Sequence, residues 1–233
     1  MSWREFWNHE HSIYVNARHR ALHYEKIAKD IASLVPAPGA HVLDYGCGEA
    51  LAADQLAQSC GGLALFDTAP SVREKLRQRF AANKNITILD EEALAKTPPA
   101  TFDMIICNSV LQYLSRTETE GLMDLWHDRL KPGARLVIAD VIPPDVHAAT
   151  DIKALLAFAR EGGFLFAALR GLVATFFSNY RTLRQKIGLS TYREQEMLQL
   201  LAKHGFKAAR ASRNIGHNQA RMTFIATRSA ESG

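Results

Sequence analysis

Short apolar runs alternate with amphipathic stretches along most of this chain. Seven runs predict strands, at 41–45, 62–66, 86–89, 102–108, 135–142, 207–213 and 222–227. Helical patterns lie between them, at 49–59, 71–80 and 117–130, and a last helix ends at His204-Gly205. Because strands and helices alternate in this way, the pattern predicts an α/β fold with a parallel sheet.

Turn and capping residues mark where several of these elements begin. An N-terminal helical segment, roughly Asn16 to Val35, is closed by the break Pro36-Ala-Pro-Gly39. Capping boxes, in which a hydroxyl residue precedes a glutamate by three positions, predict helix starts at Ser71–Glu74, Ser115–Glu118 and Thr191–Glu194. These turn and capping signals therefore divide the chain into short, separate elements.

The turn after the first predicted strand is the most informative local feature. The strand ends at Asp44, and the chain turns through Gly46 and Gly48 into a helix predicted from about Glu49 to Ser59. Glycine permits positive φ and leaves room for a ligand against the main chain. The helix would point its N-terminal amides into the crevice where open α/β sheets bind ligands. The turn therefore predicts a nucleotide-like cofactor.

The end of the second predicted strand supports this interpretation. The run 63–66 stops at Asp67, about twenty residues after the glycines, where a ribose-binding carboxylate belongs. Taken singly, Asp67 is better explained as a turn or helix-cap residue; together with Asp44 and the two glycines it favours ligand binding. A dinucleotide site would require Gly-x-Gly-x-x-Gly, and Leu51 at the sixth position argues against an oxidoreductase.

The sequence Asp44-Tyr-Gly46-Cys-Gly48 after an apolar strand resembles the first motif of class I S-adenosylmethionine-dependent methyltransferases. The resemblance runs from about Val42 to Thr227 and includes Leu130-Lys-Pro-Gly-Ala-Arg-Leu-Val-Ile-Ala-Asp140, which is similar to the family's turn before strand five. One departure is Ala50, which stands where many members carry a third glycine. The alanine side chain affects how closely the helix and the cofactor can approach each other.

The resemblance implies a fold and a cofactor site. The fold is a Rossmann-like class I methyltransferase fold, an α/β structure with a seven-stranded, mostly parallel sheet, an inserted antiparallel final strand and a helical lid insertion. The cofactor is S-adenosyl-L-methionine. Its implied contacts are Asp44, Gly46, Cys47 and Gly48 at the methionine end, Asp67 and Thr68 at the ribose, Asp90 and Glu91 at the adenine, and Asn108 at the methionine backbone groups.

Length and composition agree with one catalytic domain over 1–233, since 233 residues with 47% hydrophobic content can bury a sizeable core. We predict four parts: an N-terminal helical segment (1–38), a cofactor-binding core (39–142), a helical lid insertion (143–190), and a last helix with C-terminal strands (191–233). Cys47, Cys60 and Cys107 lack paired spacing and are expected to be reduced. The first 35 residues contain no apolar signal segment, so a cytoplasmic location is expected.

The C-terminal half is basic although the net charge is only +4. Seven Lys or Arg residues and one Glu lie between Ile152 and Arg193, and six basic residues with no acidic one lie between Lys203 and Arg228. Such asymmetry suggests an anionic partner on the basic side. The alternative is a solvated basic face that contacts nothing in particular.

The basic region contains an apolar segment, 154–177, that is interrupted by charges and so is not a membrane-spanning helix. Gly162-Gly163 is predicted to split it into two helices. The phenylalanines that follow this break, and the cations after them, are Phe164, Phe166, Phe176, Phe177, Arg181, Arg184 and Lys186. We predict an apolar lid with a cationic edge, which accepts a hydrophobic substrate or rests on an anionic membrane surface. A plain helical cap packed on the core is the alternative.

Nucleic-acid and protein substrates are disfavoured. The junction after the fourth strand reads Cys107-Asn-Ser-Val, unlike the Asn/Asp-Pro-Pro-aromatic sequence of methyltransferases that modify DNA amino groups, and no Pro-Cys pair is present. The glutamate pair expected for arginine methylation is absent as well. A small or lipid-like molecule is therefore the predicted acceptor. A non-catalytic, cofactor-binding regulatory partner is the alternative of another class.

Methyl transfer needs mainly in-line positioning and exclusion of water. A hydroxyl acceptor also needs a base with a pKa near 7, and His19 is the candidate, with His147 and His217 as unranked alternatives. Tyr113 could line the methyl-transfer site. His9-Glu-His11 is too sparse for a metal site, and no metal is assigned. The sequence leaves open the acceptor atom and the oligomeric state.

Overall fold

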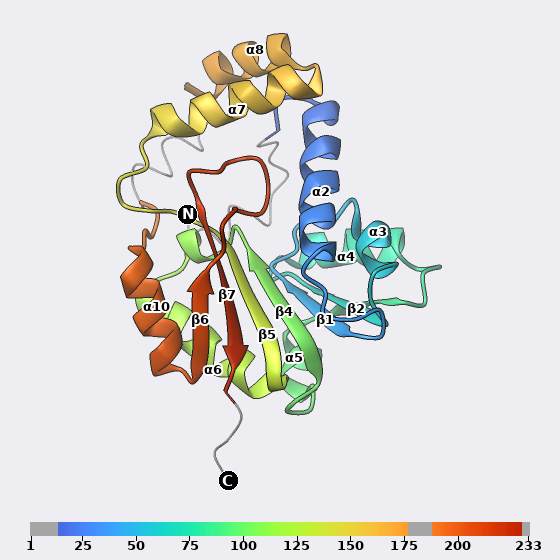
Figure 1. Cartoon of the computed structure of the whole chain (residues 1–233). Helices are drawn as coiled ribbons and strands as arrows, with labels where there is room; N and C mark the ends of the chain where they lie inside the picture. Colours follow the sequence, from blue (N-terminus) through green and yellow to red (C-terminus); the bar gives the residue numbers. More distant parts are fainter. Residues whose placement is uncertain (1–13, 177–187, 230–233) are drawn as a thin grey trace.

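The computed structural model describes residues 14–176 and 188–229. Seven strands form one sheet in the order β3-β2-β1-β4-β5-β7-β6 (Figure 1). Their bounds are β1 His41–Tyr45, β2 Gly62–Phe66, β3 Ile86–Leu89, β4 Phe102–Asn108, β5 Leu130–Val141, β6 Phe206–Arg210 and β7 Met222–Arg228. β7 lies between β5 and β6 and is antiparallel to both, whereas the other neighbouring pairs are parallel. The predicted mostly parallel sheet with an inserted final strand is confirmed.

Helices cover both faces of this sheet (Figure 1). Their bounds are α2 Ala17–Ala32, α3 Ala53–Ala57, α4 Pro70–Arg79, α5 Glu91–Lys96, η1 Leu111–Tyr113, α6 Arg116–Arg129, α7 Ala148–Gly162, α8 Leu165–Phe176 and α10 Glu194–Lys203. Successive strand residues point to opposite faces, so Leu43 packs in a core with Trp126 of α6, and Val42 in a second core with Leu56 of α3. The alternation of apolar runs and helices thus produces a three-layer structure.

Several predicted boundaries are confirmed, and others are wrong. The strands at 41–45, 62–66, 86–89 and 102–108 are found as predicted, and the Ser115–Glu118 capping box is present. The other two boxes do not form. Helix α4 begins at Pro70, whose fixed φ suits the first helical position, and α10 has Arg193 as its N-cap. The short helix α5 was not predicted.

The helix expected at 49–59 begins only at Ala53. Tertiary contacts hold the preceding residues out of it, because the Glu49 N–H donates to the Tyr24 hydroxyl at 3.2 Å and Arg79 donates to the Glu49 carbonyl. Ala50 takes a φ of 42°, an unusual value for a residue other than glycine. The helix N-terminus therefore does not follow the glycine turn directly, which corrects the expectation that its amides point into the crevice there.

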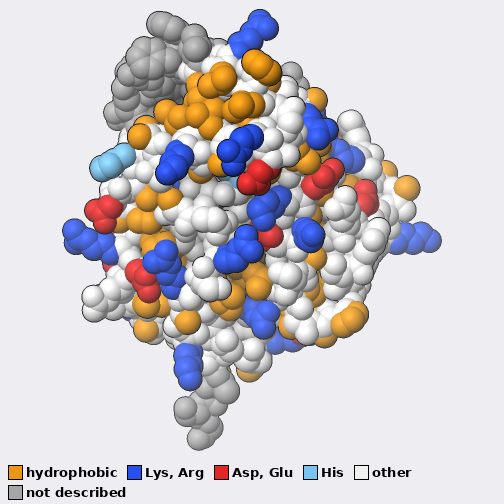
Figure 2. Space-filling view, turned by 45° about the horizontal axis from the view of Figure 1, so that its top comes forward, with side chains coloured by type: hydrophobic (Ala, Val, Ile, Leu, Met, Phe, Trp, Pro, Cys, Tyr) orange, Lys and Arg blue, Asp and Glu red, His pale blue; other side chains and the backbone are white. Residues whose placement is uncertain are grey.

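The predicted lid is a pair of helices separated at Gly163, which has a φ of 71°. Their inner side packs on Val15 and Leu22, and α8 lies at the end of the molecule farthest from the sheet (Figure 1). Figure 2 shows hydrophobic side chains gathered at this end, beside Lys and Arg. Phe177, Arg181, Arg184 and Lys186 lie outside the described residues. In the part of the chain that is described, no helix is both long and apolar enough to span a bilayer.

Candidate active site

The glycine turn lies at the carboxyl end of β1, beside the turn that follows β4. Gly46 and Gly48 have φ of 75° and 57°, in the left-handed region. A Cβ on Gly46 would collide with the side chain of Val110, and one on Gly48 would lie 3.2 Å from the Tyr24 hydroxyl. Both glycines are therefore required by the turn itself, which leaves main-chain groups of this segment at the ligand edge of the sheet.

Asp67 ties this turn to the end of β2. Its Oδ2 accepts the Gly48 N–H at 3.1 Å, and its Oδ1 accepts the Ala69 N–H at 2.9 Å. Burial raises the pKa of Asp67, against these two hydrogen bonds, which lower it. Thr68 beside it is exposed. The structure thus places Asp67 with the glycines, as the sequence predicted, and gives it a structural task in addition.

Asp44 lies in β1, two residues before Gly46 of the glycine turn. Burial and the nearby Asp67 carboxylate raise the pKa of Asp44 to about 7. Burial also raises the pKa of the Cys47 and Cys107 thiols, so they stay protonated. The end of β1 is therefore a place where one carboxyl changes its charge near neutral pH.

Asp90 and Glu91 lie at the end of β3 with partners of their own. The Asp90 carboxylate caps α5 by accepting the Ala93 N–H at 3.0 Å, and that hydrogen bond lowers its pKa. Glu91 pairs with Arg73 at 3.0 Å, and Arg73 also donates to the Asp67 carbonyl at 2.7 Å. These side chains join the ends of β2 and β3; their adenine contact stays a prediction.

A second set of polar side chains lies at the ends of β4 and β5. The Ser109 hydroxyl donates to the Asp140 carboxylate at 2.8 Å, and burial raises the pKa of Asp140. Both residues have positive φ, 60° and 59°, which costs energy in residues other than glycine and is frequent at functional sites. The neighbouring Asn108 Oδ1 is buried and has no hydrogen-bond partner within the described part of the chain. Sequence reasoning assigned no role to Ser109 or Asp140.

His19 faces the lid and is buried. Its ring stacks on Phe164 with centroids 4.9 Å apart, and lies 6.3 Å from the ring of His23 and 6.4 Å from that of His217. Burial lowers the pKa of His19, and it lowers the pKa of His23 to about 3 and of His217 to about 4. The three imidazoles are consequently neutral at pH 7 and weak as bases. His23 was not singled out from the sequence.

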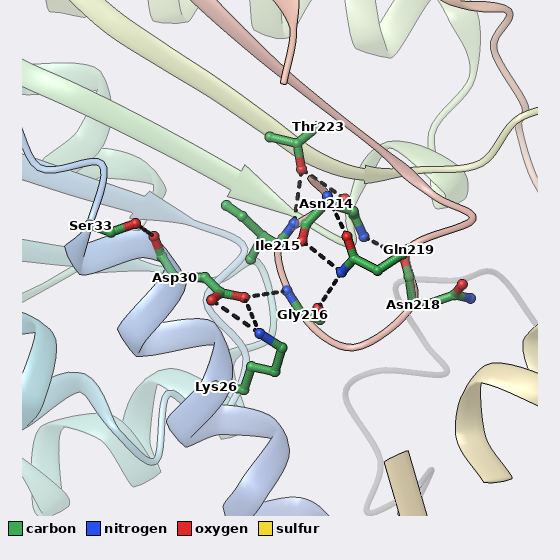
Figure 3. Close-up of polar contacts among 9 residues, drawn as sticks. All are labelled: Lys26, Asp30, Ser33, Asn214, Ile215, Gly216, Asn218, Gln219 and Thr223. Carbon is green, nitrogen blue, oxygen red and sulfur yellow. Dashed lines mark hydrogen bonds and ion pairs between the residues drawn. The ribbon is translucent and has the colours of Figure 1, made fainter. Parts of the chain in front are cut away.

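The loop between β6 and β7 contains His217 and bonds the N-terminal helix α2 through Gly216 and Asp30 (Figure 3). Asn214 of the loop accepts the Thr223 hydroxyl of β7 and donates its N–H to Gln219, and the Gly216 N–H donates to Asp30 of α2 at 2.9 Å. Elsewhere in the loop, the Arg221 guanidinium forms an ion pair with both carboxylate oxygens of Asp151 in α7, each at 2.8 Å. The loop thus holds the N-terminal helix and the lid against one edge of the site.

The remaining candidates are less central. His147 is the exposed N-cap residue of α7, and Tyr113 is half-buried in η1. His9 and His11 lie outside the described residues.

The matched family model covers the cofactor side of this arrangement. Residues 42–133 match the model described as a methyltransferase domain, a segment that contains the glycine turn, Asp67 and Asn108. The chain therefore contains a methyltransferase domain. The matched segment runs from β1 into β5 and contains every residue that the sequence predicted to bind the cofactor.

This chain spans about half the length of the curated relatives that it matches. A ubiquinone biosynthesis O-methyltransferase of Xylella fastidiosa is 31% identical over 114 residues, which is 48% of this chain and 46% of that protein. An uncharacterized methyltransferase of Mycobacterium tuberculosis is 28% identical over 126 residues, 54% of this chain and 61% of that protein. The similarity thus concerns a domain shared by proteins of differing description.

Solved structures show the shared fold over nearly the whole chain. Magnesium protoporphyrin IX methyltransferase from Synechocystis PCC 6803, with bound S-adenosylhomocysteine, superposes with a TM-score of 0.61 at 20% identity. The superposition covers 97% of this chain and 93% of that one. At this identity the likeness establishes the fold, and the lid and C-terminal strands are included in it.

Proposed function

We propose that this methyltransferase transfers a methyl group to a small, hydrophobic or lipid-like acceptor. The observation that carries the proposal is the glycine turn, which Asp67 holds at the carboxyl end of β1, beside the buried and unpaired Asn108 Oδ1. A buried polar atom without a partner is uncommon and is the kind of atom that a ligand satisfies. The residues present therefore fit the family's cofactor.

The chain's own groups divide into a cofactor side and an acceptor side. Main-chain groups of Gly46 and Gly48 and the Asn108 side chain would hold the methionine part, and Asp67 would hold the ribose hydroxyls. When bound, S-adenosylmethionine supplies a methyl group that its sulfonium already makes electrophilic. The protein's contribution is to orient the acceptor and to exclude water.

On the acceptor side we infer that Asp140 accepts the proton of a hydroxyl acceptor. Buried neutral histidines with pKa values of about 3 and 4 are poor bases at pH 7, whereas burial moves the pKa of Asp140 upward. The Ser109 hydroxyl fixes the carboxylate at 2.8 Å. Tyr113 keeps its predicted role in lining the methyl-transfer site, and His19, predicted as the base, stays the alternative to Asp140.

The residues around the lid support the proposed class of acceptor. Phe158 and Phe164 stack on His217 and His19, so aromatic rings surround this end of the molecule. The names of the relatives, a ubiquinone biosynthesis enzyme and a magnesium protoporphyrin IX enzyme, refer to small molecules. These observations support a hydrophobic small molecule as acceptor.

Methyl-label transfer tests the proposal. Purified protein, isotope-labelled S-adenosylmethionine and a cell extract are incubated and separated into lipid, small polar, protein and nucleic-acid fractions. We expect label in the lipid fraction. Label in the small polar fraction would contradict the hydrophobic acceptor, and label in none, with cofactor bound, would favour a non-catalytic regulator.

Affinity for S-adenosylmethionine is expected to rise between pH 6 and pH 8. The Asp44 carboxyl has a pKa of about 7, so it is mostly protonated at pH 6 and ionised at pH 8. The ionised form attracts the cationic cofactor, and the affinity should change by about tenfold at most per pH unit below the pKa. Titration calorimetry at pH 6, 7 and 8 measures this, and Asp44→Asn should remove the pH dependence. An equal slope in that variant would contradict the assignment.

A further inference from the structure

The outer side of the lid helices α7 and α8 carries an apolar face. Phe166 is 91% exposed, Leu169 48% and Ile152 40%. Among the side chains that the structure describes, no other large hydrophobic residue is exposed to this degree. Scattered exposed apolar residues are normal on protein surfaces, but a phenylalanine open on almost every side, on an outermost helix, is unusual.

This face is separate from the packing that holds the lid. The inner side of the helix pair buries Ala159, Phe164 and Ala168 against Val15 and Leu22 of the N-terminal segment. The lid therefore already has its core contacts, and the outer residues contribute nothing to them. Helix α8 is apolar on both sides, with Arg170 its single charged residue.

The charges around the apolar face have one predominant sign. Lys153, Arg160 and Arg170 are exposed on the two helices, against one exposed acid, Glu161. The other acid of this pair of helices, Asp151, is neutralised by its ion pair with Arg221. An apolar face bordered by cations complements the surface of an anionic bilayer, where apolar side chains enter the interface and cations meet lipid headgroups.

We propose that the outer face of α7 and α8, centred on Phe166 and Leu169, docks this methyltransferase on an anionic lipid membrane. No helix among the described residues is long and apolar enough to cross a bilayer, so the proposed contact places α8 in the interface. The inference deepens the proposed function, because a lid seated on lipid adjoins the phase in which a hydrophobic acceptor dissolves.

Vesicle co-sedimentation of the full chain tests the proposal without any acceptor or turnover. The probes are vesicles of phosphatidylcholine alone and vesicles containing one third phosphatidylglycerol. We expect binding to the anionic vesicles, and about tenfold weaker partitioning of the double variant Phe166→Ser with Leu169→Ser. These positions are exposed, so the variant should keep its circular dichroism spectrum and its affinity for S-adenosylhomocysteine.

Two double variants with the same change in net charge distinguish attraction of the membrane by the lid cations from attraction by the net charge of the protein. Arg160→Glu with Arg170→Glu should reduce binding to anionic vesicles, whereas Lys84→Glu with Lys207→Glu, the same change in net charge elsewhere, should reduce it much less. Equal losses in both pairs, or a wild-type chain that binds neither vesicle, would overturn the proposal. So would sedimentation velocity that shows a dimer dissolved by the serine variant, since the face would then bind a second copy. None of these results affects label transfer, which tests the proposed function separately.

Discussion

Replacing Asp67 by alanine is expected to weaken S-adenosylmethionine binding by about 1–3 kcal/mol, or about 5- to 150-fold. The carboxylate is predicted to accept hydrogen bonds from the ribose hydroxyls, which the variant loses. It also accepts the N–H groups of Gly48 and Ala69, at 3.1 and 2.9 Å, so the glycine turn loses its attachment to β2. Both effects act in the same direction.

Titration calorimetry with S-adenosylmethionine and S-adenosylhomocysteine measures this loss, and both ligands should weaken alike because both carry the ribose. Asp124→Ala is the matched control, since that carboxylate bonds His204 of the α6–α10 contact, away from the glycine turn. The cofactor affinity of Asp67→Asn should lie between the affinities of Asp67→Ala and Asp124→Ala, because an amide oxygen can still accept one N–H. An unchanged affinity in Asp67→Ala would remove this residue from the cofactor site.

Replacing Asp140 by asparagine is expected to lower turnover of a hydroxyl acceptor by about 10²- to 10⁴-fold, the usual contribution of a positioned general base. Asparagine suits this position because it tolerates positive φ, and Asp140 has a φ of 59°. The variant therefore keeps the backbone and the size of the side chain and loses the proton acceptor.

The measurement is the rate of label transfer to the acceptor found in the extract, across pH 5.5 to 8.5. The concentration of S-adenosylmethionine is kept saturating at every pH, so that the pH-dependent affinity expected from Asp44 does not contribute to the rate. The wild type should lose activity toward low pH as Asp140 becomes protonated, and the variant should lose that pH dependence while its cofactor affinity stays unchanged. Asp145→Asn, an exposed aspartate five residues further on, is the matched control. Normal turnover in Asp140→Asn would transfer the role of base elsewhere, with His19 the next residue to replace.

The strands could be predicted from the sequence because their signal is local. An apolar run of four to seven residues between turn residues is sufficient, and β1 to β4 appear at the predicted positions. The start of α3 could not be predicted in the same way. Tyr24 and Arg79, which hold Glu49 out of the helix, are 25 and 30 residues away in the chain. Such contacts leave no pattern in the segment itself.

The two sides of the candidate site differ for the same reason. The cofactor side rests on a contiguous motif and one acidic strand end, so Gly46, Gly48 and Asp67 could be predicted as a group from their spacing, and the structure places them together. The acceptor side depends on residues far apart, and Ser109 reaches Asp140 across 31 positions. Its positive φ values occur in residues other than glycine, so no composition signal marks them. The histidine cluster likewise draws on separate elements.

The bonds of the β6–β7 loop affect the order in which the elements around the site are joined during folding. During translation the loop emerges after α2 and α7, so both helices leave the ribosome before Gly216 and Arg221 can bond Asp30 and Asp151. The nascent methyltransferase can form the glycine turn early, from residues within a single βαβ unit. The N-terminal helix and the lid can pack on Glu49 and on each other before then, but their bonds to the β6–β7 loop form only when the final hairpin is made, so this edge of the site is completed last.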